Sequence, residues 1–410
     1  MDIGIVYHIE SAQQFWSELG DILSLPKDAT LHTLDGNLRN FITFCATHHE
    51  RYLSTLAQLD HCCNLLLDSE FFTFHSERSC DTLLDDARSN TDPHLLFILY
   101  NVFLCYGHRH PSFFRSSKRW QPLIPLLMDH LLIQTTEISL EFIEGKLGLL
   151  AIEMLYEVCR VQNLSSAELR IFDDAYIDHL FDIVESTRSN EILNYSLIKF
   201  LVSLNEQFMV ASVQNPSRDA KEHATATTGG LPTKKALTNR VLAILMRRLY
   251  STKTFGENLI FMLNRADDSD EDLCVQLLIL KMLYLLFTTP GAQEYFYTND
   301  LRVLIDVFVR ALNNLSEENE SMRHTYLRVL HPLLNNTQLR TNPYKPLLVR
   351  HTLQSIISHA HIRDINPTTR RLVERCLSGE WCKAIPPSPV FDSSLSTYCR
   401  YRHSRTLSCC

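Results

Sequence analysis

Close pairs of histidines are the residues whose type and spacing come nearest to metal chemistry in this sequence. A neutral imidazole is a common ligand of Zn²⁺. The pairs are His48 with His49, His108 with His110, and His359 with His361. Because helical neighbours one or two residues apart point in different directions, such a pair binds one ion only where the backbone is irregular. We therefore interpret these histidines as solvated or core side chains and predict no metal site.

Two other groups of potential ligands lead to the same conclusion. Cys376 and Cys382 are six residues apart and lack the second pair that completes a zinc ribbon. The acidic run 267–272 lacks the glycine and the distal glutamate of an EF-hand loop. We interpret the cysteines as ordinary thiols. The acidic run is interpreted as a favourable charge at the N-terminus of the helix that follows it.

Catalytic signatures are missing from the sequence. We find no GxxxxGK[ST], no GxGxxG after a strand, no HExxH and no GxSxG. The scarcity of glycine also disfavours a loop that cradles phosphate. The sequence therefore predicts neither an enzyme nor a cofactor, and the histidines alone keep an enzyme as an alternative.

The chain is organised around the stretch 191–214. One apolar stripe of this stretch has helical spacing and runs through Leu197, Leu201, Leu204, Phe208 and Ala211. A second stripe contains Ile198, Val202 and Met209. Two stripes make the helix apolar over most of its circumference, so it must be packed on two sides. The polar run Asn205, Glu206 and Gln207 occupies the narrow remaining face, where we expect a working surface.

Composition indicates an all-α protein. The chain has 410 residues, 45% of them hydrophobic, with only 11 glycines and 15 prolines and no sustained alternation of apolar and polar residues. Its formal net charge of −8 disfavours a general nucleic-acid binder. No apolar run is long enough to span a membrane, and the N-terminus does not resemble a secretion signal. We therefore expect a cytoplasmic protein without a transmembrane segment.

The cysteines fit that compartment. Six of the twelve lie within helical apolar patterns, without the spacing of a disulfide framework: Cys45, Cys62, Cys63, Cys105, Cys159 and Cys274. We predict that they are reduced core thiols.

Capping residues predict several helix boundaries. Ser11 with Gln14 opens the first helix. Asp92 followed by proline opens a helix that Gly107 closes. Further capping boxes are expected where Ser165 is followed by Glu168 and where Thr254 is followed by Glu257, and Asn366 caps the helix 367–378. Between these signals, a single long helical pattern runs over about 34–67, a loop with at most one short helix occupies 76–90, and a helix covers 165–186.

The chain divides into a helical domain, residues 1–378, and a tail, residues 379–410. Residues 215–235 have no hydrophobic period and are expected to form a flexible insertion. Strongly apolar helices recur near Leu149, Tyr195, Gln276 and His324, and two of the three intervals fit a HEAT or armadillo repeat. We predict an irregular armadillo/HEAT-like α-solenoid with a disordered C-terminal tail. A compact multi-helix bundle is the alternative.

The tail contains a candidate ligand for SH3 domains. Lys383, Pro386 and Pro389 have the spacing of a basic residue followed by a PxxP motif. In a polyproline II segment the two prolines lie on one edge, with the lysine one turn earlier. The alternative is that the prolines only stiffen a solvated tail.

Five segments carry a resemblance to a known family. They are YSLIKFLVSLNEQFMV (195–210), GENLIFMLNR (256–265), VQLLILKMLYLLFTT (275–289), YFYTNDLRVLIDVFVR (295–310) and RHTYLRVLHPLLNNTQLR (323–340). Together they resemble the leucine-rich domain of the WISH/DIP/SPIN proteins and their fungal relatives, over most of residues 93–345.

The resemblance implies a function. It implies an armadillo-like domain that allosterically activates the actin-related protein 2/3 complex without a preformed filament, and so forms linear seed filaments at endocytic, cortical actin patches. The sequence lacks an LKKT-like monomer-binding segment and an acidic tail with tryptophan. It also enters helical sequence by Ser11, without the N-terminal SH3 domain of the mammalian relatives, and so resembles the shorter fungal form. A generic α-solenoid adaptor without nucleation activity is the alternative. The oligomeric state is left open, with a monomer favoured.

Polar residues on otherwise apolar helices are the predicted contacts to the complex: Asn205, Glu206, Gln207, Asn258 and Arg265. The competing interpretation is that Asn205 and Gln207 only hydrogen-bond loop backbone within the array, as buried amides commonly do.

Overall fold

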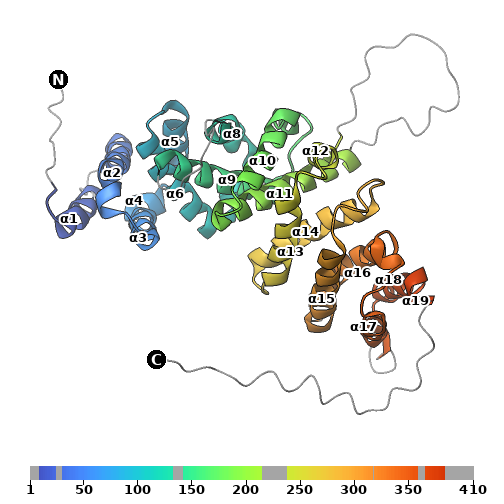
Figure 1. Ribbon diagram of the computed structural model, residues 1–410. Helices are drawn as coiled ribbons and strands as arrows, with labels where there is room; N and C mark the ends of the chain where they lie inside the picture. Colours follow the sequence, from blue (N-terminus) through green and yellow to red (C-terminus); the bar gives the residue numbers. More distant parts are fainter. Residues whose placement is uncertain are drawn as a thin grey trace, which may run out of the picture. The chain divides into compact units, whose positions relative to one another are not determined.

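The structure is a computed structural model that describes residues 9–24, 30–132, 142–214, 238–316, 318–358 and 365–383. These ranges contain nineteen α-helices and no strand, which confirms the predicted all-α class (Figure 1). The chain forms two compact units, residues 1–285 and 286–410. The predicted insertion, His359, His361, Pro386 and Pro389 lie outside the described residues.

Unit 1 begins with five helices: α1 (Ala12–Leu23), α2 (Leu31–Tyr52), α3 (Leu56–Leu67), α4 (Glu70–Phe74) and α5 (Ser76–Ser89). The Ser11 cap is confirmed, since Ser11 accepts a hydrogen bond from the backbone N–H of Gln14. The single long helix over 34–67 is wrong. Helix α2 ends at Tyr52, and α3 begins after Thr55, which forms a reciprocal capping box with Gln58.

The loop expected over 76–90 is also wrong, because this segment forms α5. Its side chains are mostly polar, yet Cys80, Leu83, Leu84 and Ala87 recur at helical spacing and are all buried. A short apolar stripe therefore suffices when neighbouring helices cover it.

The middle of unit 1 contains α6 (Pro93–Arg109), the 3₁₀ turn η1 (Pro111–Arg115), α7 (Ser117–Trp120), α8 (Ile124–Leu132) and α9 (Ile143–Val161). The Asp92 cap is confirmed, with its carboxylate accepting from the N–H of His94. Gly107 does not close α6, which continues to Arg109. The glycine instead makes room for the ring of Phe114, because a Cβ at this position would lie 1.9 Å from Cε2 of that ring.

Unit 1 continues with η2 (Glu168–Ile171), α10 (Asp174–Ser186), α11 (Glu191–Gln214), α12 (Arg240–Arg247), α13 (Lys253–Arg265) and α14 (Asp270–Thr288), whose last three residues belong to unit 2. Ser165 and Glu168 do cap each other, but they open η2, and α10 starts separately after Asp173. The Thr254 capping box is wrong: the carboxylate of Glu185 accepts from the N–H groups of Thr254 and Phe255.

The long helices of unit 1 stack in succession. Helix α1 packs on α2, α2 on α6, α6 on α9, and α9 on α11, while α3, α5, α8, α10 and α12 lie beside this row (Figure 1). Helix α11 contacts α9, α10, α12 and α13, as its two apolar stripes require. This arrangement confirms the irregular α-solenoid.

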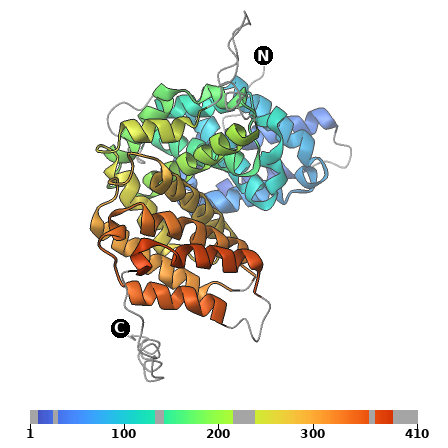
Figure 2. The ribbon, with the colours of Figure 1, turned by 90° about the vertical axis from the view of Figure 1, so that its right-hand side faces the viewer.

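Unit 2 contains α15 (Thr298–Asn314), α16 (Glu320–Asn335), η4 (Gln338–Arg340), α17 (Pro346–Ser358), α18 (Pro367–Leu377) and α19 (Glu380–Lys383). Helix α15 packs on α16 and α17, and α18 packs on the same two helices, shown in orange and red in Figure 2. The Asn366 cap is confirmed. Beyond Gly379, where the tail was predicted to begin, Trp381 of α19 is fully buried and its indole N–H donates to the carbonyl of Cys376.

The cysteines in the described ranges are all free thiols. Cys45, Cys62, Cys63 and Cys159 are buried as predicted, whereas Cys105 and Cys274 are only partly buried. Among the helices that the structure describes, none combines the length and apolarity needed to cross a membrane.

Three partly buried histidines indicate that stability depends on pH. Burial lowers the pKa of His130, whose Nε2 lies 3.0 Å from the hydroxyl of Tyr100, and it also lowers the pKa of His324 and His331 in unit 2. A lowered folded-state pKa means that the unfolded chain binds more protons below its own pKa of about 6.5. We therefore expect the free energy of unfolding to fall as pH decreases through and below that value.

Urea unfolding at pH 7.5 and 5.5 measures this dependence. His130→Gln, which keeps a polar group near Tyr100, should reduce the difference between the two pH values, whereas His75→Gln at an exposed position should leave it unchanged. A difference that is the same in His130→Gln and the wild type would show that this histidine does not contribute.

Candidate partner-binding face on helix α11

A strip of one side of α11 remains available at the surface of unit 1. Ile192, Tyr195, Lys199 and Glu206 follow one another at steps of three, four and seven residues, so they share one side of the helix. Ile192 is 62% exposed, and the other three are partly exposed. We call this strip, together with the side chains of α13 and α14 that contact it, the α11 face.

Helix α13 contributes aromatic and cationic groups. The ring of Phe261 lies 6.0 Å from that of Tyr195, and the guanidinium of Arg265 lies 4.9 Å above the Phe261 ring. Phe261 is 38% exposed and Arg265 is also exposed. Arginine and aromatic side chains of this kind are enriched in the central contacts of protein interfaces.

Helix α14 contributes charges of both signs. Lys199 Nζ lies 2.8 Å from Oε1 of Glu271, and Lys281 Nζ lies 2.5 Å from Oε1 of Glu206. The hydrogen bond from Lys199 lowers the pKa of the Glu271 carboxyl. Oε2 of Glu206 is buried and has no hydrogen-bond partner among the described residues.

A polar recess of about 140 Å³ adjoins the face. It is lined by residues of α6, α9, α11 and α14: Leu104, His108, Glu153, Tyr156, Glu157, Ser196, Lys199 and Glu271. Burial raises the pKa of Glu153, and the nearby Lys199 opposes this effect only in part. Glu157 is paired with Arg160 at 2.5 Å. Fixed charges of alternating sign can recognise a complementary polar surface, with Ile192 and Phe261 supplying apolar contact.

Two of the predicted contact residues have a different role. Gln207 is only 5% exposed, and its amide nitrogen donates to the carbonyls of Cys159 and Gln162 while its oxygen accepts from the N–H of Leu164. Asn205 is fully buried and accepts from the side chain of Asn239, the N-cap of α12. Neither amide reaches the surface of unit 1. Gln207 hydrogen-bonds backbone groups as the competing interpretation describes, whereas Asn205 bonds to side chains, and contact of these two residues with the complex stays a prediction.

The other three predicted residues lie on or near the α11 face. Glu206 and Arg265 belong to it, whereas Asn258 is partly buried and donates to the oxygen of Asn194, which is itself bonded to the end of α10. The sequence interpretation missed Lys199, Glu271 and Lys281. The sequence did contain a signal for Lys199, which lies seven residues before Glu206 on an otherwise apolar helix.

Of the histidines and cysteines considered as possible metal ligands, those within the described residues lie apart from this face or contribute to it singly. His48 packs against the rings of Phe44 and Tyr52, and His110 packs against Tyr106. His108 lines the recess. Cys376 is buried and donates to the carbonyl of Leu327, while Cys382 lies on α19. Lys383 of the candidate SH3 ligand is exposed at the end of α19.

Known proteins are similar to this chain in the same region. Residues 190–347 match the family described as SPIN90/Ldb17, leucine-rich domain, a span that contains the whole of α11, α13 and α14. Protein dip1 of Schizosaccharomyces pombe is 29% identical over 362 residues, which cover 87% of this chain and 90% of that protein. Protein LDB17 of Saccharomyces cerevisiae is 26% identical over 376 residues, 81% of this chain and 71% of that protein. Residues 190–347, which contain the α11 face, therefore match the leucine-rich domain of the WISH/DIP/SPIN proteins, as the sequence resemblance predicted.

Proposed function

We propose that the protein binds and activates the actin-related protein 2/3 complex without a preformed filament, and that the linear filaments so formed seed branched networks at cortical, endocytic actin patches. The observation that carries the proposal is the similarity to Protein dip1, which extends over 87% of this chain and 90% of the length of that protein. The proposed function is therefore inferred for nearly the whole chain and not for one matching segment alone.

The activation is allosteric. A scaffold shifts a partner between two arrangements only by binding one of them more tightly. Helix α11 suits such a scaffold, because most of its apolar side chains are buried and Gln207 ties it to the end of α9. The α11 face then presents its charges and rings at fixed positions, which limits the entropy lost on binding.

Assembly of pyrene-labelled actin tests the activity. Actin monomers and the purified complex are mixed without preformed filaments, with and without this protein. We expect the protein to shorten the lag and to yield linear filaments in fluorescence microscopy. Binding to the complex without any acceleration would replace the proposal with the adaptor alternative.

The role of the α11 face is tested by Arg265→Glu. This change places a negative charge beside the Phe261 ring and should weaken binding to the complex by at least about tenfold. Arginine is enriched among interface hot spots, whose loss costs about 2 kcal/mol or more, and about 1.4 kcal/mol already corresponds to tenfold. Arg51→Glu is the matched control, because Arg51 lies 5.1 Å above the ring of Tyr52 on α2, outside residues 190–347.

A charge swap separates recognition from folding. The double variant Glu206→Lys with Lys281→Glu keeps the ion pair but reverses its direction. We expect it to fold normally and to activate less. Full activity in both the swap and Arg265→Glu, with an active wild type, would remove the α11 face from the interface and leave the activity itself standing.

A further inference from the structure

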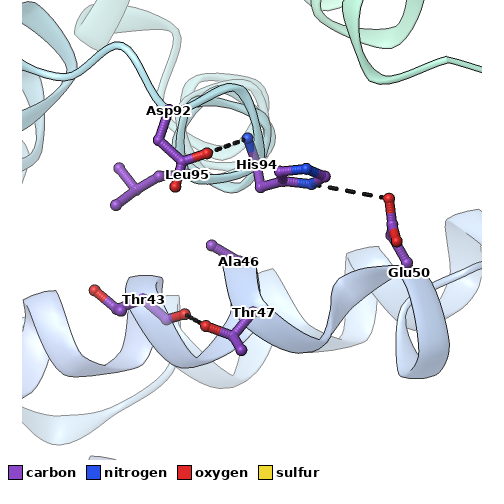
Figure 3. Close-up of a pocket in the computed structure, with 7 residues that line it drawn as sticks. All are labelled: Thr43, Ala46, Thr47, Glu50, Asp92, His94 and Leu95. Atoms are coloured by element: carbon purple, nitrogen blue, oxygen red, sulfur yellow. Dashed lines mark hydrogen bonds and ion pairs between the residues drawn. The ribbon is translucent and has the colours of Figure 1, made fainter. Parts of the chain in front are cut away.

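Two histidines and a glutamate converge between α2 and α6, away from the α11 face. Nε2 of His49 lies 2.8 Å from Nδ1 of His94, and the same Nδ1 lies 3.9 Å from Oε1 of Glu50. One donor atom from each of the three residues lies within 4.8 Å of the other two. Figure 3 shows His94 and Glu50 facing each other across the recess, with Asp92 fixing the backbone of His94.

The fold brings these residues together from two different helices. His49 and Glu50 are in the last turn of α2, and His94 is in the first turn of α6, next to Pro93. Helices α2 and α6 pack directly on each other. Although His49 and Glu50 are neighbours on one helix, a donor atom of each lies within 4.8 Å of the other and of His94.

One shared proton joins the two imidazoles but leaves the exposed carboxylate of Glu50 outside the hydrogen bond. At neutral pH, one imidazole N–H of the pair donates to the lone pair of the other. The carboxylate of Glu50 then faces a nitrogen that is already engaged. A divalent cation at the point of convergence would instead accept a lone pair from all three groups at once.

We propose that His49, Glu50 and His94 form a Zn²⁺ site. Two imidazoles and a carboxylate suit zinc better than Mg²⁺ or Ca²⁺, which prefer oxygen ligands. A fourth position opens into the recess of about 280 Å³ that Glu50 and His94 line, where water or a donor from a partner completes a tetrahedron.

The movement that binding requires is small. Zn–N distances of about 2.0–2.1 Å and tetrahedral angles place donor atoms about 3.3 Å apart. The two nitrogens must therefore separate slightly from 2.8 Å, and the carboxylate must approach His94 from 3.9 Å. The side chains of Glu50 and His94 are 75% and 40% exposed, so both can adjust without disturbing the core.

Charged groups of both signs lie near His49, and burial disfavours a net positive charge on its ring. The negative charges of Glu50 and Asp92 act on His49, and the positive charge of Lys146 opposes them. A bound ion would join the end of α2 to the start of α6 and so stabilise two consecutive helices of the row in unit 1.

Zinc titration of the full-length protein tests the proposal, with ZnCl₂ against a chromophoric competitor. We expect one equivalent to bind with Kd in the micromolar range or tighter, and the melting temperature to rise with zinc concentration. His94→Ala and Glu50→Gln remove exposed ligands and should each weaken binding at least about tenfold, since even loss of groups that only support ligands costs that much. His32→Ala, an exposed histidine at the other end of α2, should change nothing.

The thiols of the twelve cysteines require a separate readout. Co²⁺ in place of Zn²⁺ should give the d–d absorption of a nitrogen and oxygen site, without the intense near-ultraviolet band of thiolate ligands. The proposal is overturned by the absence of saturable binding, by equal affinity in His94→Ala, or by a thiolate spectrum. Actin assembly is measured independently, because these ligands lie outside residues 190–347.

Discussion

Replacing Gly107 with alanine is expected to destabilise the protein, although the same replacement inside a helix normally stabilises. Alanine is favoured over glycine in a helix interior by about 1 kcal/mol. At Gly107, however, the new Cβ would lie 1.9, 2.6 and 2.7 Å from three atoms of the Phe114 ring. Real Cβ contacts do not reach such distances, so the ring or the helix must move.

The ring has little room to move. Phe114 is fully buried, and its centroid lies 4.9 Å from that of Trp120, which is also fully buried, and 5.4 Å from that of Phe113. Overpacking of a well-filled core costs about 1–3 kcal/mol or more, which exceeds the gain in helix propensity. We therefore expect a net loss of about 2 kcal/mol in the free energy of unfolding, measured in urea.

Gly36→Ala is the matched control. Gly36 lies within α2, and a Cβ there would meet nothing within 4 Å. Its replacement should be neutral or stabilise by up to about 1 kcal/mol. Replacing the Phe114 ring with the smaller side chain of leucine (Phe114→Leu) should restore part of the stability that Gly107→Ala loses. A Gly107→Ala protein as stable as the wild type would mean that the close approach is absent.

Gly107 also shows which parts of the fold could be predicted from sequence. Signals confined to a few neighbouring residues were sufficient at Ser11, Asp92 and Asn366, whose caps all form as expected. A glycine near a helix end has two explanations, a C-terminal cap or a close approach by another segment. The second depends on the position of Phe114, which helical periodicity does not give.

Other boundaries were missed because their causes are remote or weak. The start of α13 is capped by Glu185, about seventy residues earlier in the chain, so no local motif marks it. The break between α2 and α3 occurs at Leu53, without a glycine or proline, and the apolar pattern continues on both sides. Tertiary packing decides such a break, and periodicity alone does not reveal it.

The candidate site, too, could be predicted from the sequence only in part. The pattern of polar residues on an apolar helix indicated Asn205, Glu206 and Gln207 as candidates, but it did not show which of them face outward. That depends on where neighbouring chain segments leave backbone groups unpaired. Gln207 meets the loop after α9, whereas Glu206, one residue away and about 100° round the helix, meets Lys281.

Replacing Gln207 with leucine is expected to destabilise unit 1 by about 3 kcal/mol, although leucine has a similar size and a higher hydrophobicity. The change leaves the N–H of Leu164 and the carbonyls of Cys159 and Gln162 without their partner. Each buried polar group left unpaired costs about 1–3 kcal/mol, and partial relaxation keeps the sum toward the lower end. Gln162 extends this hydrogen-bond network to Phe114, because its own side chain donates to the carbonyl of Phe114 at 2.5 Å.

Gln207→Glu separates hydrogen bonding from shape. The carboxylate can still accept from Leu164, but its second oxygen would face the carbonyl oxygens of Cys159 and Gln162, which repel it. Protonation gives that oxygen a hydrogen to donate, so the folded state should raise the pKa of this carboxyl, and the loss of stability relative to the wild type should shrink as pH falls.

Gln354→Leu at an exposed position of α17 is the control and should have little effect. Urea unfolding of the three variants at pH 7.5 and 5.5 checks the prediction. If Gln207→Leu were as stable as Gln354→Leu, the amide would not hold α9 and α11 together, and the fixed geometry proposed for the α11 face would lose its support.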